Sequence, residues 1–337
     1  LRLDGDMGTA MRLGGMLGYL AMDAAPFLSE IAEGPEGGRA WWLRARDSTR
    51  LRIASWPASP GGKGTILMFP GRTEYIEKYG RLARDMATRG YGMVAVDWRG
   101  QGLADRPAHR RDMGHVVSFD EYREDVEAVR AALEKLNPPK PWFLIAHSMG
   151  GAIGLRALYD GLPVAGVIFS APMWGIRMSG FLKAISGVVM GLSKSLGLDT
   201  SFAPTTGPAA PMEFADNPLT NDREMFDYME GQVARHPELA LGGPSIRWVN
   251  AALKETETLM AMDPPDLPML VLLGTDERIV ESSAILARAA TWPGCKLHKV
   301  ERGRHEVLME SPDMREPLLD LIDTWCDEVM TVQAKTG

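Results

Sequence analysis

The spacing of hydrophobic and polar positions changes along the chain, and each change predicts a different kind of element. Residues 41–46 and 49–56 alternate apolar and polar side chains around a turn signal at Asp47-Ser48, which predicts a β-hairpin. Residues 65–69 form a continuous apolar run, the pattern of a strand buried on both faces. Strand and helix patterns then alternate, which implies a mostly parallel sheet flanked by helices and an α/β fold. The predicted helices cover 76–89, 118–136 and 149–160, and the predicted strands cover 92–97, 141–146 and 164–170.

The alternation stops over residues 173–262, where no convincing buried strand is found. This segment carries Met, Gly, Phe and Trp in helical stretches, such as Met178–Phe181, separated by Gly/Pro breaks. We expect a helical lid inserted between two late strands of the sheet; a second structural domain is the alternative. After it, the sequence predicts strands over 268–273 and 296–300 and helices over 281–290 and 313–332. The expected organisation is an N-terminal tail (1–39), an α/β core (40–172 and 263–337) and the lid (173–262).

Composition and charge exclude several classes of protein. The 337 residues are 45% hydrophobic and 24% charged, as in an ordinary globular protein, and no apolar run is long enough to span a membrane. A net charge of −7 argues against nucleic acid as a partner, because phosphate binding requires a basic face. The two cysteines, Cys295 and Cys326, are too few for a disulfide framework or a zinc site, so we expect reduced thiols and a cytoplasmic location.

Residues 1–21 are rich in Met and Gly, with a short apolar patch at 16–22 that acidic Asp23 follows at once. The patch is at the lower limit for the apolar region of a signal peptide. We expect a loose tail, or sequence upstream of a natural start at Met22, rather than a signal peptide.

The candidate chemistry begins with Ser148, in the segment Ala146-His147-Ser148-Met149-Gly150-Gly151 between a predicted strand and a predicted helix. A serine at a sharp strand-to-helix turn with small neighbours is typical of the nucleophile elbow of α/β-hydrolases. The usual pattern is Gly-x-Ser-x-Gly, and Ala146 replaces its first glycine.

A serine nucleophile requires a histidine base and a carboxylate that orients the base, which follow the serine in the order acid, then histidine. Of six histidines, His305 lies in a polar loop directly after the strand predicted at 296–300, where the base is expected. The loop after the strand at 268–273 offers two adjacent carboxylates, Asp276 and Glu277. The pattern alone does not choose between them.

The same mechanism requires two backbone N–H groups for the negative charge that develops on the substrate oxygen. The residue after the nucleophile, Met149, supplies one of them. We expect the other from Arg72, in the loop that follows the strand at 65–69, where Gly71 permits close approach of the backbone.

With these residues in place, the chain resembles the α/β-hydrolases that include bacterial lysophospholipases, monoacylglycerol lipases and serine aminopeptidases. The resemblance is carried by segments 69–75, 97–102, 146–151, 274–280 and 303–306. It is nearest to bacterial lysophospholipases, because of Glu74-Tyr75, Lys78-Tyr79 and segments 170–175, 236–239 and 241–244. Two positions depart from the family pattern: Pro70 replaces a histidine in the oxyanion loop, and Ala146 replaces a glycine in the elbow. Neither change removes a required N–H group.

The resemblance implies that Glu277, three residues after Gly274, is the acid of the triad, with Asp276 as the alternative. It also implies substrate contacts at Glu74 and Trp174. We expect Glu74 to contact a polar head group; the alternative is a structural carboxylate paired with Arg72 or Lys78.

The leading hypothesis is a serine hydrolase that cleaves a small lipid ester, a lysophospholipid or monoacylglycerol, without a cofactor or metal. A peptidase or small-molecule esterase on the same triad is the alternative; an aminopeptidase would use Glu74 or Glu213 to hold the substrate amine. A non-catalytic ligand-binding relative is a third reading. The arginines within 106–111 offer transient contact with a membrane surface, although the net charge favours a solvated loop.

Overall fold

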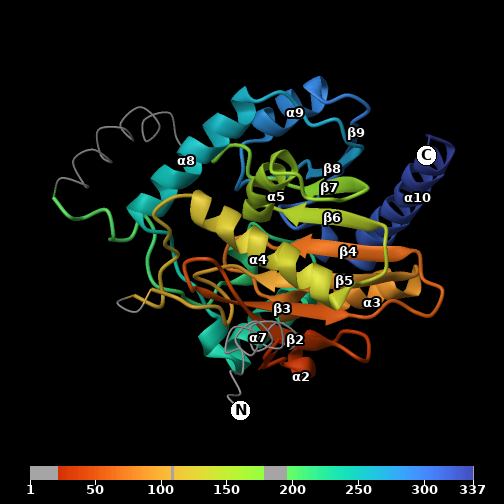
Figure 1. Cartoon of the computed structure of the whole chain (residues 1–337). Helices are drawn as coiled ribbons and strands as arrows, with labels where there is room; N and C mark the ends of the chain where they lie inside the picture. The colour runs from red at the N-terminus through yellow and green to blue at the C-terminus, as the bar shows by residue number, and fades with distance from the viewer. Residues whose placement is uncertain (1–21, 108–109, 178–195, 337) are drawn as a thin grey trace, which may run out of the picture.

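The computed structural model describes residues 22–107, 110–177 and 196–336 (Figure 1). The expectations for residues 1–21 and for Met178–Phe181 lie outside this described part. A nine-stranded sheet forms the centre, in the order β1-β2-β3-β5-β4-β6-β7-β8-β9. Strands β1, β2 and β3 pair antiparallel, β3 pairs antiparallel with β5, and β5 through β9 pair parallel. The strands are β1 (Ala24–Ala25), β2 (Arg39–Arg44), β3 (Arg50–Trp56), β4 (Gly64–Phe69), β5 (Tyr91–Asp97), β6 (Trp142–His147), β7 (Gly166–Ser170), β8 (Met269–Gly274) and β9 (Lys296–Val300).

Helices cover both faces of this sheet. The helices are α2 (Ser29–Ala32), α3 (Gly80–Thr88), α4 (Asp120–Leu136), α5 (Met149–Tyr159), α7 (Arg223–Arg235), α8 (Ile246–Ala261), α9 (Ser282–Thr291) and α10 (Pro312–Thr336), with 3-10 turns η1 (Ile76–Tyr79), η2 (Phe214–Asp216), η3 (Pro237–Leu239) and η4 (Val307–Met309). Helices α4, α5, α8 and α9 pack into one apolar cluster, and α3, α7 and α10 pack into another on the opposite face. The predicted α/β-hydrolase architecture, a mostly parallel sheet flanked by helices, is confirmed.

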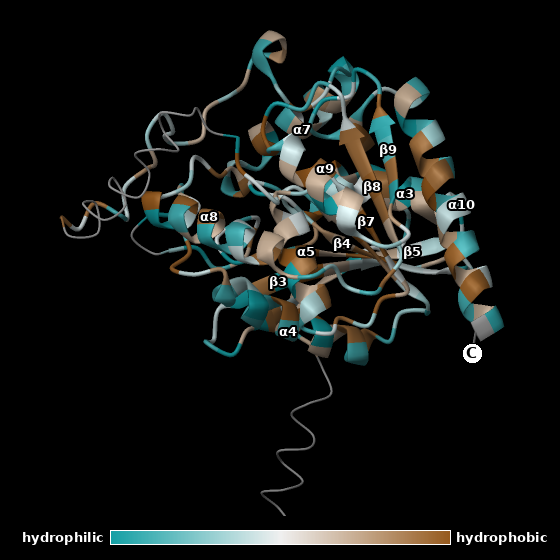
Figure 2. Cartoon of the chain, turned by 90° about the horizontal axis from the view of Figure 1, so that it is seen from above, coloured by the Kyte–Doolittle hydropathy of each residue, from teal (hydrophilic) through white to brown (hydrophobic). Residues whose placement is uncertain are grey.

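The continuous apolar run of β4 divides between the two clusters. Leu67 and Phe69 belong to the first cluster, whereas Ile66 and Met68 belong to the second, because successive side chains of a strand point to opposite faces. The edge strand β9 has exposed polar residues and is drawn teal in Figure 2, beside the brown, fully buried β8.

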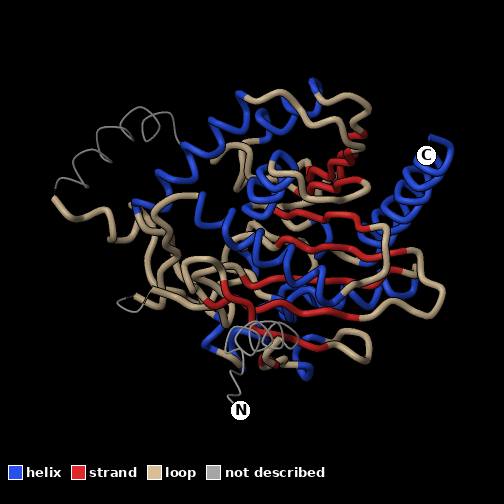
Figure 3. Tube along the Cα trace, in the orientation of Figure 1, coloured by secondary structure: helices blue, strands red, loops and turns tan. Residues whose placement is uncertain are grey.

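The segment between β7 and β8 contributes one helix to each face, since α7 packs into the second cluster and α8 into the first. In its described residues it forms helices and loops, with only isolated bridges to other segments. Figure 3 shows long loops gathered beyond the carboxyl ends of β4 and β6, where the candidate residues lie.

The expected tail is wrong from Ala24 onward, because this part of the chain is packed on the core. Strand β1 pairs with β2, and the Tyr228 hydroxyl donates to the carbonyl of Ala32 at 2.8 Å. Ile31 and Ala32 are buried. A two-residue strand and a four-residue helix are too short to carry a periodic signal, so the pattern gave no indication of them.

A buried arginine fixes the loops near the candidate site. Arg52 in β3 has no exposed surface and donates to Asp97 at 2.7 Å and to Glu77 at 2.7 and 2.9 Å. Asp97 in turn accepts the backbone N–H of Ile76 at 2.8 Å. The start of β3 and the end of β5 are thereby tied to the segment that follows the predicted oxyanion loop.

Candidate active site

Ser148 lies at the turn between β6 and α5. Its backbone has φ 50° and ψ −120°, a conformation that a non-glycine residue adopts at an energetic cost. The surrounding backbone holds it there: Ser148 N–H donates to the Ser170 carbonyl at 3.1 Å, and its own carbonyl accepts the N–H groups of Gly151 and Met173, both at 2.8 Å. This is the strained elbow that the sequence predicts.

The departure at Ala146 is accommodated by a glycine on the facing helix. A Cβ atom built on Gly154 would lie 3.0 Å from the Ala146 Cβ and 3.1 Å from Leu144 Cδ2. The missing side chain at Gly154 therefore leaves the space that the Ala146 methyl group fills. The elbow tolerates alanine at its first position for this reason.

Glu277 and His305 are brought together from two loops. The His305 Nδ1 atom lies 2.7 Å from Glu277 Oε2, and both residues are buried. Burial raises the pKa of Glu277, but the hydrogen bond to His305 and the N–H groups of Ile279 and Val280 more than offset this and hold the pKa below its ordinary value. Asp276 is exposed and its N–H donates to the Gly303 carbonyl. The geometry thus favours Glu277 over Asp276 as the partner of His305.

Ser148 and His305 line the same cavity, which has a volume of about 1280 Å³. Apolar side chains form much of its wall, many of them from the segment between β7 and β8, including Leu219, Phe226, Met229, Leu241, Trp248 and Leu253. A cavity of this size and character accepts a long apolar ligand with its reacting group near Ser148.

The loop 70–74 is held against the elbow. A Cβ atom on Gly71 would lie 3.0 Å from Ser148 Cβ and 3.1 Å from Glu74 Oε2, so glycine allows this close approach without displacing either neighbour. The indole of Trp98 donates to the Pro70 carbonyl at 3.1 Å, and the Gln101 amide donates to the Gly71 carbonyl at 2.7 Å. Both donors come from segment 97–102, so that segment holds the backbone of the loop in position.

The two predicted oxyanion donors lie next to Ser148 and Gly71, where the loop contacts the elbow. Met149 is the first residue of α5, and Arg72 follows Gly71; both line the cavity. The Arg72 side chain donates from Nη1 to the Gly242 carbonyl at 2.7 Å and lies 5.9 Å from the centre of the Trp248 ring. Burial lowers the pKa of Arg72 to about 10, and the guanidinium is therefore charged at neutral pH.

Glu74 belongs to a buried charge cluster rather than standing free. Its carboxylate accepts the Lys78 ammonium at 2.8 Å, the Tyr79 hydroxyl at 2.5 Å and the N–H of Gly71. Lys78 also pairs with Glu306 at 2.7 Å. Glu74 thus pairs with Lys78, which was the alternative to a contact with a polar head group. It also lines the cavity.

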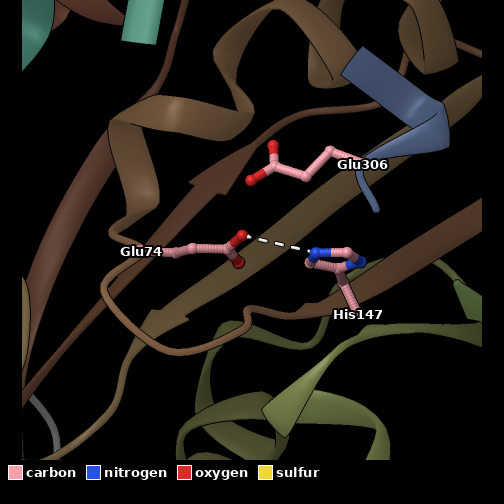
Figure 4. Close-up of side chains that lie close together, drawn as sticks. All are labelled: Glu74, His147 and Glu306. Atoms are coloured by element: carbon pink, nitrogen blue, oxygen red, sulfur yellow. Dashed lines mark ion pairs between the residues drawn. The ribbon is translucent and has the colours of Figure 1, made fainter. Parts of the chain in front are cut away.

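His147 faces the same cluster, as Figure 4 shows with Glu74 and Glu306. Its Nδ1 lies 3.0 Å from the Ser170 carbonyl and its Nε2 lies 3.6 Å from Glu74 Oε1. Burial lowers the pKa of His147 to about 3, so the ring is neutral at pH 7. One atom from each of Glu74, His147 and Glu306 lies within 4.8 Å of the others, but both carboxylates already pair with the Lys78 ammonium, and we assign no metal there.

Trp174 does not have the expected position at the substrate. It is buried, its indole donates to the Gly151 carbonyl at 3.2 Å, and its ring packs edge-on against Phe169 at 4.8 Å. It belongs to the apolar cluster behind the elbow and is absent from the cavity wall. Its contribution to the site is indirect: the hydrogen bond to Gly151 supports the first turn of α5, which follows Ser148.

Arg106 supports neither the solvated loop favoured for residues 106–111 nor the alternative of a membrane contact. Its guanidinium donates to five backbone carbonyls, among them Glu238, Leu239 and Ala240 of the β7–β8 segment. Arg106 therefore links two loops instead of presenting a free charge. Among the described residues, no helix combines the length and apolar character that crossing a bilayer requires.

Sequence comparisons agree with this geometry. Residues 61–312 match the family model described as serine aminopeptidase, S33. The chain is 31% identical over 272 residues to lysophospholipase L2 of Escherichia coli strain K12, covering 76% of this chain and 78% of that protein. It is 26% identical over 261 residues to a probable lysophospholipase L2 of Haemophilus influenzae, covering 77% and 82%.

Among solved structures, a soluble variant of monoglyceride lipase from Saccharomyces cerevisiae superposes with a TM-score of 0.66 at 19% identity, covering 85% of this chain and 94% of that chain. At 19% identity, this similarity shows a shared fold and carries no conclusion about function.

Proposed function

The chain belongs to the serine aminopeptidase S33 family of α/β-hydrolases, and we propose that it is a carboxylic ester hydrolase of small lipids that acts through Ser148. The observation that carries the proposal is the buried pairing of Glu277 with His305, which lines the same apolar cavity as Ser148. The curated relatives named lysophospholipase support the lipid ester as substrate.

The mechanism follows from the tautomer of His305. A carboxylate only accepts hydrogen bonds, so His305 donates its Nδ1–H to Glu277 and keeps an unprotonated Nε2 as the base. His305 takes the hydroxyl proton of Ser148 as the oxygen attacks the acyl carbonyl, and then returns it to the departing alcohol. Water, activated by the same nitrogen, releases the fatty acid from the acyl-enzyme.

The N–H groups of Arg72 and Met149 are the proposed oxyanion donors. They lie on two backbones that the hydrogen bonds of Trp98, Gln101 and Ser170 hold in place. Donors fixed in advance stabilise the tetrahedral intermediate without reorganising during the reaction. The reaction requires no cofactor.

The segment 173–262 is proposed as the lid over the acyl chain. Support comes from its apolar contribution to the cavity and from the bond between the Gly242 carbonyl and Arg72. We also propose a cytoplasmic location, which the free thiols of Cys295 and Cys326 support.

The peptidase alternative has weaker support, although the matched family is described as serine aminopeptidase. Of its two candidate acids for a substrate amine, Glu74 already accepts Lys78, Tyr79 and Gly71, so its charge is largely neutralised. The other candidate, Glu213, is exposed in the cavity wall and does not belong to the Glu74–Lys78–Glu306 charge cluster.

A substrate panel with wild type and Ser148→Ala tests the proposal. We expect release of fatty acid from lysophospholipids and monoacylglycerols, faster than cleavage of aminoacyl amides, and loss of all turnover in Ser148→Ala. Preferential cleavage of aminoacyl amides would favour the peptidase, and the absence of any turnover would favour a ligand-binding relative.

A further inference from the structure

The cavity beside Ser148 contains an arginine whose charge no acidic side chain balances. Arg72 is half-buried, and the one hydrogen bond of its guanidinium to the described residues goes from Nη1 to the neutral carbonyl of Gly242. A guanidinium has five N–H donors, so Nε and Nη2 retain theirs for a ligand. Neither atom is among the buried side-chain nitrogens cut off from solvent.

The other cations of the cavity wall are occupied or exposed. Lys78 pairs with Glu74 and Glu306, and Arg223 pairs with Asp227 at 2.8 Å. Arg177 is exposed and donates to the backbone carbonyl of Glu277. Lys78 is held by the two carboxylates nearest the nucleophile, whereas no carboxylate pairs with Arg72 among the described residues. The Arg72 guanidinium is therefore the charge at this end of the cavity that can attract an anionic ligand.

The location of Arg72 relates that charge to the reacting ester. Its backbone N–H is a proposed oxyanion donor, and its side chain extends for five bonds, or roughly 6 Å, toward Gly242 and Trp248 in the same wall. In a 1-acyl lysophospholipid the phosphorus is six bonds from the acyl carbonyl carbon, a separation of roughly 7 Å when extended. In a monoacylglycerol an uncharged hydroxyl takes the place of that phosphate.

We propose that the guanidinium of Arg72 binds the phosphate of a lysophospholipid head group and thereby selects lysophospholipids over neutral monoacylglycerols. The inference rests on the proposed function and narrows its substrate class. Arginine suits this role because its planar fork donates two parallel hydrogen bonds to phosphate oxygens. Hydrogen bonds to a charged group of this kind change binding by about 10- to 100-fold.

The test compares kcat/KM for 1-oleoyl lysophosphatidylcholine and 1-oleoylglycerol, which share the acyl chain. We expect the ratio of the two values to fall by about 10- to 100-fold in Arg72→Gln, and by less in Arg72→Lys, which keeps a point charge. The matched control is Arg223→Gln, a cation of the same cavity that Asp227 already balances, and its ratio should stay within about twofold of wild type.

A second measurement uses glycerol 3-phosphate and inorganic phosphate as inhibitors of p-nitrophenyl butyrate hydrolysis. Glycerol 3-phosphate should inhibit wild type competitively, and Arg72→Gln should lose that inhibition. An unchanged substrate ratio in Arg72→Gln overturns the proposal. If both kcat/KM values fall equally while the ratio is unchanged, the side chain serves to hold Gly242 instead. Phosphate inhibition without preference for the lysophospholipid also overturns it, because the site would then bind a free anion. Fatty acid release from the two lipids by wild type separates such a result from a failure of the proposed function, which would abolish release from both.

Discussion

The Nδ1 atom of His305 lies 2.7 Å from Oε2 of Glu277, while Oε1 of the same carboxylate accepts the backbone N–H groups of Ile279 and Val280. One oxygen is thus fixed by the backbone and the other is aimed at the imidazole. The neighbouring Asp276 is exposed and makes no corresponding bond with its carboxylate in the described residues. The two adjacent acids therefore have different consequences when they are replaced.

Replacement of the carboxylate that faces His305 should remove most of the activity. We expect Glu277→Gln to lower kcat on a p-nitrophenyl ester by roughly three to four orders of magnitude, because the amide no longer fixes the imidazole tautomer. Asp276→Asn is the matched control and should retain kcat within about threefold. If Asp276→Asn loses activity and Glu277→Gln does not, the assignment of the acid is wrong.

The buried ammonium of Lys78 should be important for stability. It pairs with Glu74 at 2.8 Å and with Glu306 at 2.7 Å, and its removal leaves two buried carboxylates without a counter-charge. We expect Lys78→Met to lower the free energy of unfolding in urea by about 3–5 kcal/mol. Lys63→Met breaks the more exposed pairs with Asp323 and Asp327 and should cost no more than about 1 kcal/mol. Equal effects of the two substitutions would contradict the role given to Lys78.

The space shared by Ala146 and Gly154 predicts a coupled pair of substitutions. Gly154→Ala alone places a Cβ atom 3.0 Å from that of Ala146 and should destabilise the fold by about 1–3 kcal/mol. In the Ala146→Gly background the same substitution should cost at least about 1 kcal/mol less, as measured by a double-mutant cycle of urea unfolding. Additive costs would show that the two positions do not compete for space.

The charge of Glu74 should make its contribution to stability depend on pH. Burial raises the pKa of Glu74, but Lys78 and its other partners outweigh burial and hold the pKa at about 2, below the ordinary 4.5. A depressed pKa contributes stability that is fully present above the unfolded value and is lost as the pH falls toward the folded value. We expect the difference in unfolding free energy between wild type and Glu74→Gln to be constant from pH 7 to about 5 and to shrink below about 4.5. A difference that grows on acidification has the opposite sign and would refute the depressed pKa.

Most of the sheet was predictable because its elements are long and periodic. The buried run 65–69 became β4, and the helix predicted at 118–136 became α4. Ser148 and His305 were also predictable, because each lies where a strand ends and a short polar or small-residue signal follows it. The choice of Glu277 needed the family resemblance, and the bond to His305 now supports it independently of that resemblance.

The missed features depend on partners distant in sequence. Arg52 occupies a polar position of an alternating strand, so the pattern places it toward solvent, yet it is buried on Glu77 and Asp97, which are 25 and 45 residues away. Trp174 was expected at the substrate, but the pattern of a single aromatic side chain does not say which side of the elbow it packs on. Burial of these side chains is decided by tertiary contacts that no local period encodes.

The central claim, that Ser148 carries the acyl group, is tested most directly by locating the adduct. Enzyme mixed with p-nitrophenyl decanoate and quenched in acid should carry one decanoyl group on the peptide that contains Ser148, with a matching burst of p-nitrophenol, and Ser148→Ala should show neither. A decanoyl group on another residue, or a burst that persists in Ser148→Ala, would contradict the account.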